Sequence, residues 1–164
     1  MKLFHGTRSA GDIFASGFEA SPGGEFGPGV YLTERPEAAR FWASICGRGS
    51  GRPTVVEVEA SLANPRRVSK LEWIKLTERS TPRAVQRRWM KAGHDGILGV
   101  GINGIDVQVV AFDASAVRPV AVVDREEAGR GWVGREEAEP ASAVELREAI
   151  ERFEASQRQA TVRG

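Results

Sequence analysis

Residue types that carry whole classes of chemistry are scarce in this chain. Its 164 residues include one cysteine, Cys46, and two histidines, His5 and His94. A single cysteine cannot form an internal disulfide, and one thiol with two imidazoles is a poor ligand set for zinc. The sequence therefore predicts no metal centre, and we expect Cys46 to pack against its neighbours in a helix.

Long apolar runs are also missing. No stretch approaches the roughly 20 apolar residues that a membrane-spanning helix needs, and residues 1–6, Met-Lys-Leu-Phe-His-Gly, do not begin a signal peptide. We therefore expect a cytoplasmic protein with no cleavable signal peptide and no membrane partner. A hydrophobic content of 41% over this length is enough for one domain with a core, and not for two.

Two short motifs near the N-terminus are the most informative positive feature. Residues 4–7 read Phe-His-Gly-Thr and residues 27–33 read Gly-Pro-Gly-Val-Tyr-Leu-Thr. A glycine such as Gly6 lets a flat ligand approach the backbone closely. Tyr31 offers an aromatic face, worth about 0.5–2 kcal/mol to a cationic ring. Each motif alone is common, but the two in this order are a much stronger signal.

The two motifs resemble the halves of the nicotinamide pocket of ADP-ribosyltransferases, in the His-Tyr-Glu branch that contains poly(ADP-ribose) polymerases and diphtheria-like toxins. The resemblance covers roughly residues 2–120. It implies an α+β fold in which two small antiparallel sheets form an NAD cleft with flanking helices. It also implies that NAD is bound as a substrate, with His5 on the adenosine ribose. The residues that it places at the NAD site are His5, Gly6, Thr7, Gly29, Tyr31, Thr33 and Phe41.

Phe41 stands where a second aromatic closes the nicotinamide stack in this family, on the helix that follows the tyrosine strand. A different interpretation is that Phe41 or Trp42 forms the apolar face of that helix with Ala38 and Ile45. We favour this packing role for Trp42 and leave both roles open for Phe41.

Gln108 is the main departure from the family pattern. Small bacterial and phage-borne members carry a similar segment in which a glutamate stands four residues before a phenylalanine, here Phe112. In the family this glutamate bonds the 2′-hydroxyl of the nicotinamide ribose, and its charge stabilises the oxocarbenium-like transition state. Gln108 keeps the hydrogen bond without the charge, which can cost about 2–4 kcal/mol, or two to three decades in rate. The family's polymer formers rely on the glutamate, so we predict mono-transfer.

Three interpretations of Gln108 follow. The enzyme can be active with a His5, Tyr31 and Gln108 set, in which Asp106, on the same face of a strand as Gln108, acts as a base or positions the acceptor. Alternatively, the pocket binds NAD or ADP-ribose without transfer. The third interpretation makes Asp106 and Gln108 ordinary polar residues on the exposed face of a strand.

The resemblance thus implies a mono-ADP-ribosyltransferase that places ADP-ribose on DNA, RNA or a protein and releases nicotinamide. The alternative is a non-catalytic module that binds NAD or ADP-ribose. An RNA 2′-phosphotransferase is a less favoured alternative, because its chemistry resembles a site with additional histidine and arginine residues, and this chain has only two histidines.

The middle of the chain is strongly basic. Residues 66–91 hold nine basic and two acidic side chains, a net charge of +7. That density is typical of a surface that binds phosphate backbones, so DNA or RNA is a candidate partner. Trp73 and Trp89 lie in this segment, and we expect them to pack inside rather than stack on bases. The basic residues are Arg66, Arg67, Lys70, Lys75, Arg79, Arg83, Arg87, Arg88 and Lys91.

Capping signals indicate where the helices begin. Ser9 can cap a short helix whose apolar face is Ile13 and Phe14 and which ends at Gly17. Ser69 and Thr81 precede two more helices. We interpret His94, in a turn, as a packing ring.

Strand patterns place the other elements around these helices. Residues 55–60 alternate like a half-buried strand, and we expect late strands near residues 96–100, 105–112 and 117–123 to pair antiparallel with the early ones. The predicted organisation is a catalytic domain over residues 1–123, a linker over 124–140, and a C-terminal helix with a tail over 141–164.

Overall fold

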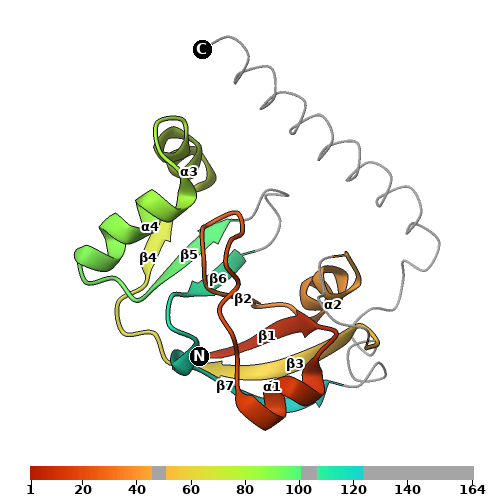
Figure 1. The fold of residues 1–164 in the computed structure, drawn as a ribbon. Coiled ribbons are helices and arrows are strands. Elements are labelled where there is room, and N and C mark those ends of the chain that lie inside the picture. Colours follow the sequence, from red (N-terminus) through yellow and green to blue (C-terminus); the bar gives the residue numbers. More distant parts are fainter. Residues whose placement is uncertain (46–50, 101–106, 124–164) are drawn as a thin grey trace, which may run out of the picture. The chain divides into compact units, whose positions relative to one another are not determined.

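One seven-stranded sheet runs through the computed structural model, which describes residues 1–45, 51–100 and 107–123 (Figure 1). The strand order is β4-β5-β6-β2-β1-β3-β7. Neighbouring strands are antiparallel except β4 and β5, which are parallel. The strands are β1 (Lys2–Thr7), β2 (Val30–Thr33), β3 (Thr54–Ala60), β4 (Arg66–Val68), β5 (Gly96–Val100), β6 (Val107–Ala111) and β7 (Val117–Val123).

The α+β class is confirmed, but the expectation of two small antiparallel sheets is wrong. A single residue pair, Phe4 with Thr33, joins β1 to β2 and makes the two halves one sheet. The half β1-β3-β7 is held by long ladders, and so is the half β2-β6-β5. Two of the late strands pair antiparallel with early ones as expected, β6 with β2 and β7 with β3. The expectation is wrong for β5, which lies antiparallel to the late strand β6 and parallel to β4, a strand that the sequence did not predict.

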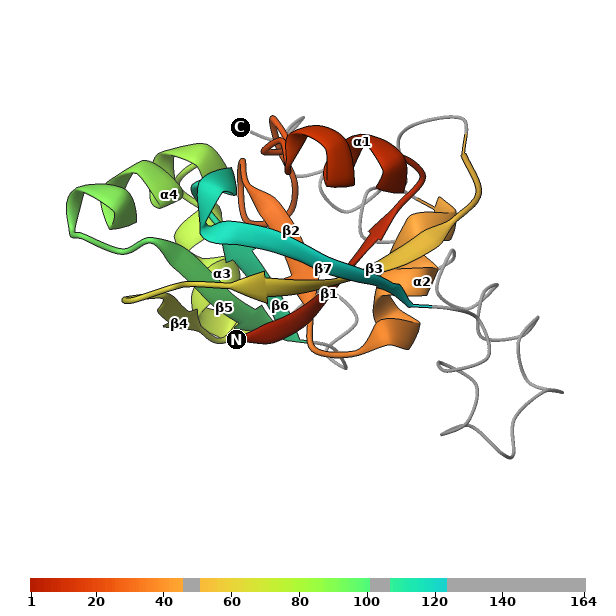
Figure 2. The same ribbon diagram turned by 90° about the horizontal axis from the view of Figure 1, so that it is seen from below.

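Four α-helices occur in the described residues: α1 (Ala10–Ser16), α2 (Pro36–Ile45), α3 (Lys70–Thr77) and α4 (Pro82–Lys91); a 3-10 turn covers Ala114–Ala116. The predicted caps of α3 and α4 are confirmed, because Ser69 accepts from the Glu72 amide and Thr81 accepts from the Ala84 amide. Figure 2, from below, shows α1 and α2 on opposite sides of β1, β3 and β7.

The first helix differs from its prediction in two respects. Ser9 stands at the N-cap of α1, but its side chain makes no capping hydrogen bond. Ile13 is buried whereas Phe14 is 45% exposed, so the apolar face does not include both. Gly17 ends the helix as expected, at a φ of +86° that favours glycine.

Apolar side chains form two cores on the sheet. The first contains Leu3, Val30, Leu32, Val56, Val58, Ala60, Val109, Ala111 and Val117. The second contains Phe26, Val68, Trp73, Val85, Ile97 and Val110. Trp73 is buried in the second core and Trp89 packs against it, which confirms the expected packing role of both.

Some predictions fall on parts of the chain that the structure leaves undescribed. Cys46, Asp106, the linker over residues 124–140 and the helix with its tail over residues 141–164 all lie outside the described residues. Within the described ranges, no helix has the length and apolar character of a membrane span. The same ranges contain no group of three or more acidic, His or Cys side chains placed to hold a metal ion.

Candidate functional site

The two edges of β1 are used differently. At the edge next to β3, Met1 donates to the Ala60 carbonyl at 2.9 Å and the Ala60 amide donates to the Met1 carbonyl at 2.9 Å. Such doubly bonded pairs alternate along an antiparallel ladder. Leu3 and His5 therefore direct their peptide N–H and C=O groups to β3, whereas Phe4 and Gly6 direct theirs to β2.

The edge next to β2 is open beyond Phe4. Phe4 pairs with Thr33, and the register between β1 and β2 goes no further in the described residues. Gly6 therefore points a donor and an acceptor toward β2 without a ladder partner there, while Tyr31, two residues before Thr33, points its own peptide groups back toward β1. We call the region between residues 5–7 of β1 and residues 29–31, where β2 begins, the β1–β2 opening.

His5 reaches across this opening with its ring. Its Nδ1 lies 2.8 Å from the Tyr31 carbonyl oxygen. A carbonyl can only accept, so Nδ1 carries the hydrogen. Burial lowers the pKa of His5 below 6.5, and the ring is neutral at pH 7. Its Nε2 then has a free lone pair that can accept a hydrogen bond from a hydroxyl.

Tyr31 lines the opening and also fixes the glycine-rich loop, residues 21–29. Its hydroxyl donates to the Gly27 carbonyl at 2.6 Å and accepts from the Phe26 amide at 3.0 Å. Burial raises the pKa of Tyr31 far above 10, so this hydroxyl stays protonated. A Cβ on Gly24 would lie 2.3 Å from the hydroxyl oxygen, which explains the glycine at this position.

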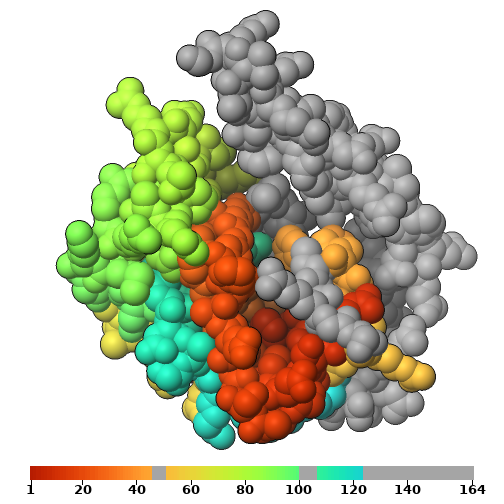
Figure 3. Space-filling view, viewed as in Figure 1, coloured from red at the N-terminus to blue at the C-terminus, as the bar shows by residue number. Residues whose placement is uncertain are grey.

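Further contacts hold the glycine-rich loop in place. Backbone bonds of 2.9 and 3.0 Å between Ser21 and Gly29 close its base, and Phe26 is completely buried in the second core. Helix α4 holds the outer side, because Gln86 donates to the Pro28 carbonyl and Arg83 donates to the Pro22 carbonyl. The space-filling view shows the loop, in orange-red, bordering the green surface of the helices (Figure 3). The side of the opening that Tyr31 forms is therefore built in advance of any ligand.

Residue 6 also has to be a glycine, because no side chain fits at this position. A Cβ at this position would lie 1.8 Å from the Ala39 carbonyl oxygen, because α2 packs directly onto β1. Arg8 secures the end of that helix by donating to the carbonyls of Ala43 at 3.3 Å and Ser44 at 3.2 Å. Arg8 belongs to neither sequence motif, although a cation near the last carbonyls of a helix is a known stabilising pattern.

Gln108 lies on the same face of the sheet as Tyr31. It pairs with Thr33, and Val110 pairs with Tyr31; directly opposed residues, and residues two apart on a strand, share a face. Gln108 is 6% exposed. Gln108 is therefore not on an exposed face, and that part of the third interpretation is wrong; Asp106, its other residue, lies outside the described residues.

Phe41 lies on the far side of α2 from the sheet. The buried residues of this helix are Ala39 and Ala43, and Ile45 is 51% exposed, so the sheet-facing side is not the one with Ala38 and Ile45. At about 100° per residue, Phe41 projects opposite Ala39 and Ala43. Its ring contacts Trp42 at a centroid distance of 5.4 Å. Its place in a nicotinamide stack stays a prediction.

The hydroxyls of Thr7 and Thr33 shape the chain at the ends of the two strands. The Thr7 Oγ1 accepts from the Ser9 amide at 3.0 Å, and the Thr33 Oγ1 accepts from the Arg35 amide at 3.3 Å. Gly29 has a φ of +153° and lies against the Ala111 carbonyl, where a Cβ would be 2.6 Å away. Thr7, Thr33 and Gly29 therefore lie at the border of the β1–β2 opening, where they fix the course of the backbone.

His94 belongs to a separate turn. Its Nδ1 lies 3.0 Å from the Asn64 carbonyl oxygen, and the neighbouring Asp95 carboxylate accepts from the Ala63 and Asn64 amides. These hydrogen bonds join the turn before β4 to the start of β5. His94 therefore makes a hydrogen bond within the fold, and its role as a packing ring stays a prediction.

A scan against protein-family models and a search of the curated proteins gave no match for this chain. A function for this chain is therefore inferred from the two motifs and from the geometry of the β1–β2 opening.

Proposed function

We propose that this chain is a mono-ADP-ribosyltransferase that takes NAD as its substrate, transfers ADP-ribose to a nucleic acid or a protein, and releases nicotinamide. The observation that carries the proposal is the β1–β2 opening, where a peptide donor and acceptor at Gly6, an imidazole acceptor at His5 and an aromatic ring at Tyr31 come from two strands joined by one residue pair.

The nicotinamide end of NAD suits the Gly6 edge. A carboxamide has one C=O and one NH₂ group, which complement a peptide N–H and C=O that point the same way. Tyr31, on the face that carries α2, supplies an aromatic ring for the cationic pyridinium. Two backbone hydrogen bonds and one ring contact would therefore fix the plane of the leaving group.

The sugar hydroxyls suit His5 and Gln108. The Nε2 of neutral His5 accepts from a ribose hydroxyl, and the Gln108 amide oxygen accepts from another. As the bond between ribose and nicotinamide breaks, its electron pair leaves with nicotinamide and positive charge develops on the ribose. The acceptor then bonds to that carbon and releases its proton. The Gln108 dipole stabilises this charge less than a carboxylate would.

A second candidate, the binding module without transfer, is favoured by one observation. The position that matches the catalytic glutamate is an uncharged glutamine, and it is buried. Such a module would hold NAD or ADP-ribose through the same groups and release no nicotinamide.

Incubation with NAD labelled separately in nicotinamide and in adenine separates the two candidates. The proposal predicts nicotinamide release, with adenine label on DNA, RNA or protein when a cell lysate is present. Tight NAD binding without release would establish the binding module. The absence of both binding and release would contradict the use of NAD altogether.

A further inference from the structure

The outer face of α4 carries a row of cations that the NAD site does not use. Arg83, Arg87 and Lys91 follow one another at intervals of four residues, and all three are exposed. Residues four apart share one side of a helix, and each step is about 6 Å, so the row is about 12 Å long. Arg88 is also exposed and widens the row at its centre.

This face is unbalanced in charge. Helix α4 contains no acidic residue, and the described residues give these four cations no ion pair. The opposite side of the helix is buried through Val85 and Gln86, so the row points away from the core. By contrast, Arg66 of the same basic segment is paired with Glu72 at 2.7 Å. Among the basic residues of segment 66–91, those without an ion pair in the described part of the chain are therefore more numerous on α4 than on β4.

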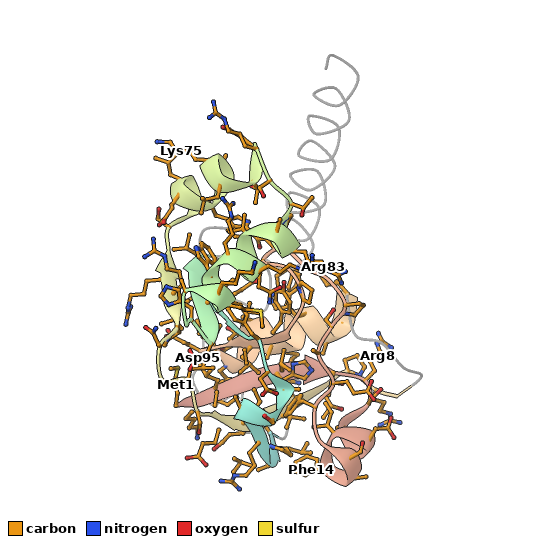
Figure 4. The ribbon with its side chains drawn as sticks, turned by 60° about the vertical axis from the view of Figure 1, so that its left-hand side comes forward. Met1, Arg8, Phe14, Lys75, Arg83 and Asp95 are labelled. Carbon is orange, nitrogen blue, oxygen red and sulfur yellow. The ribbon has the colours of Figure 1, made fainter. Side chains whose placement is uncertain are left out.

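The row begins next to the glycine-rich loop. Arg83 donates to the Pro22 carbonyl at 3.1 Å, and the Gly24 of that loop lies against Tyr31. A long polyanion seated on α4 would therefore reach the loop that borders the β1–β2 opening. Figure 4 shows Arg83 and, well apart from it, Lys75 of α3.

We propose that this row, Arg83, Arg87, Arg88 and Lys91, is the docking surface for the phosphate backbone of a nucleic acid, and that the docked strand is the acceptor for ADP-ribose. The acceptor part of this inference rests on the proposed function, whereas the docking part does not. Because Trp73 is buried and Trp89 packs on it, the surface offers no stacking platform. Binding therefore depends on phosphates, is strongly dependent on salt and is indifferent to base sequence.

The test measures the fluorescence anisotropy of labelled single-stranded DNA, duplex DNA and single-stranded RNA of one length with the full chain, from about 50 to 200 mM salt. The test variant is R87E with K91E. The control is R67E with K75E, two exposed cations of the basic segment on β4 and α3 that change the net charge by the same amount.

The inference predicts that R87E/K91E lowers affinity at least about tenfold and flattens the salt dependence by about two phosphate contacts, while R67E/K75E loses much less. Equal losses of affinity in the two variants would show that the net charge alone attracts the nucleic acid, and would overturn the proposal that this row is the docking surface. Absence of binding to all three probes would also overturn it and would leave an acidic protein as the acceptor. The probe bound most tightly distinguishes DNA from RNA.

Nicotinamide release from NAD alone is measured on the same variants. If the row serves only to dock the acceptor, R87E/K91E releases nicotinamide at the wild-type rate while label transfer to the bound polymer falls. Docking without any transfer by the wild type would contradict the acceptor role. Loss of nicotinamide release in the wild type itself would instead contradict the proposed function.

Discussion

The two edges of β1 form a contrast within one strand. Toward β3, all six residues of β1 are paired in register, whereas toward β2 the register holds one pair, Phe4 with Thr33. A buried peptide N–H or C=O group without a hydrogen-bond partner costs free energy, so in folded chains nearly all such groups are paired with backbone, side chains or water. The closed edge holds the fold together, whereas at the open edge the peptide donor and acceptor of Gly6 have no ladder partner in the described residues.

The largest effect is expected from adding charge across the open edge. Gln108→Glu would place a carboxylate where positive charge develops, and we expect nicotinamide release to rise by about two to three decades, equivalent to 2–4 kcal/mol of barrier. Initial rates of release from labelled NAD measure this. Gln108→Leu is the control and should lower the rate. Equal loss in both variants would argue against a catalytic place for residue 108.

A methyl group at residue 6 should disturb the packing of α2 on β1, and through it the contacts on both edges of that strand. Gly6→Ala places a Cβ 1.8 Å from the Ala39 carbonyl oxygen, so α2 must move away from β1. We expect a loss of about 3 kcal/mol in the free energy of unfolding, measured by urea denaturation. In Gly11→Ala the new Cβ meets nothing within 4 Å, and this control should gain about 0.5–1 kcal/mol. A Gly6→Ala protein as stable as the wild type would mean that α2 does not pack as described.

Removal of one hydroxyl tests how the open edge is held. Tyr31→Phe keeps the ring and loses the bonds to Gly27 and Phe26. We expect a cost of about 1–3 kcal/mol, because a buried carbonyl and amide lose their partner. The loss should appear as faster hydrogen exchange of the amides at residues 24–27, with exchange in the β1–β3 ladder unchanged. Uniformly faster exchange would indicate global destabilisation and no specific role in the loop.

The smallest effect is a pH dependence at His5. Its folded-state pKa is lowered, so the unfolded chain takes up this proton first as the pH falls. The stability that neutral His5 contributes is therefore complete above about pH 6.5 and is lost as the pH falls through the lower folded value. Urea unfolding between pH 7.5 and 4.5 should show a smaller acid loss in His5→Gln than in the wild type. Identical pH profiles would mean that His5 is not buried in its neutral form.

Much of the fold follows from local sequence signals. The caps Ser69 and Thr81 and the strand at residues 117–123 depend on neighbours in the chain, and these predictions are confirmed. The exposure of Phe14 does not follow from the local pattern, because Phe14 sits next to Ile13 in a helix of seven residues, too short to show which side is buried. The joining of the sheet at Phe4 and Thr33 is a contact between distant residues, and no local pattern contains it.

The candidate site was predictable in its residue types more than in its arrangement. The glycines and Tyr31 were visible as a motif, because close approach and stacking need those residues. The second role of Tyr31 in holding the glycine-rich loop, and the burial of Gln108, depend on packing between β2, β6 and α4. The sequence also did not show which of the basic residues would have no ion pair among the described residues.

The open edge of β1 is tested most directly as a nicotinamide site by titrating the ¹⁵N-labelled protein with NAD and following the amide signals in nuclear magnetic resonance. If NAD occupies the β1–β2 opening, the Gly6 backbone amide and the Gln108 side-chain amide should shift together with one dissociation constant, and the amides of Val56 and Val58 in the closed ladder should stay in place. A spectrum that is unchanged by NAD, or shifts that leave out Gly6, would contradict the claim that the open edge of β1 is the nicotinamide site.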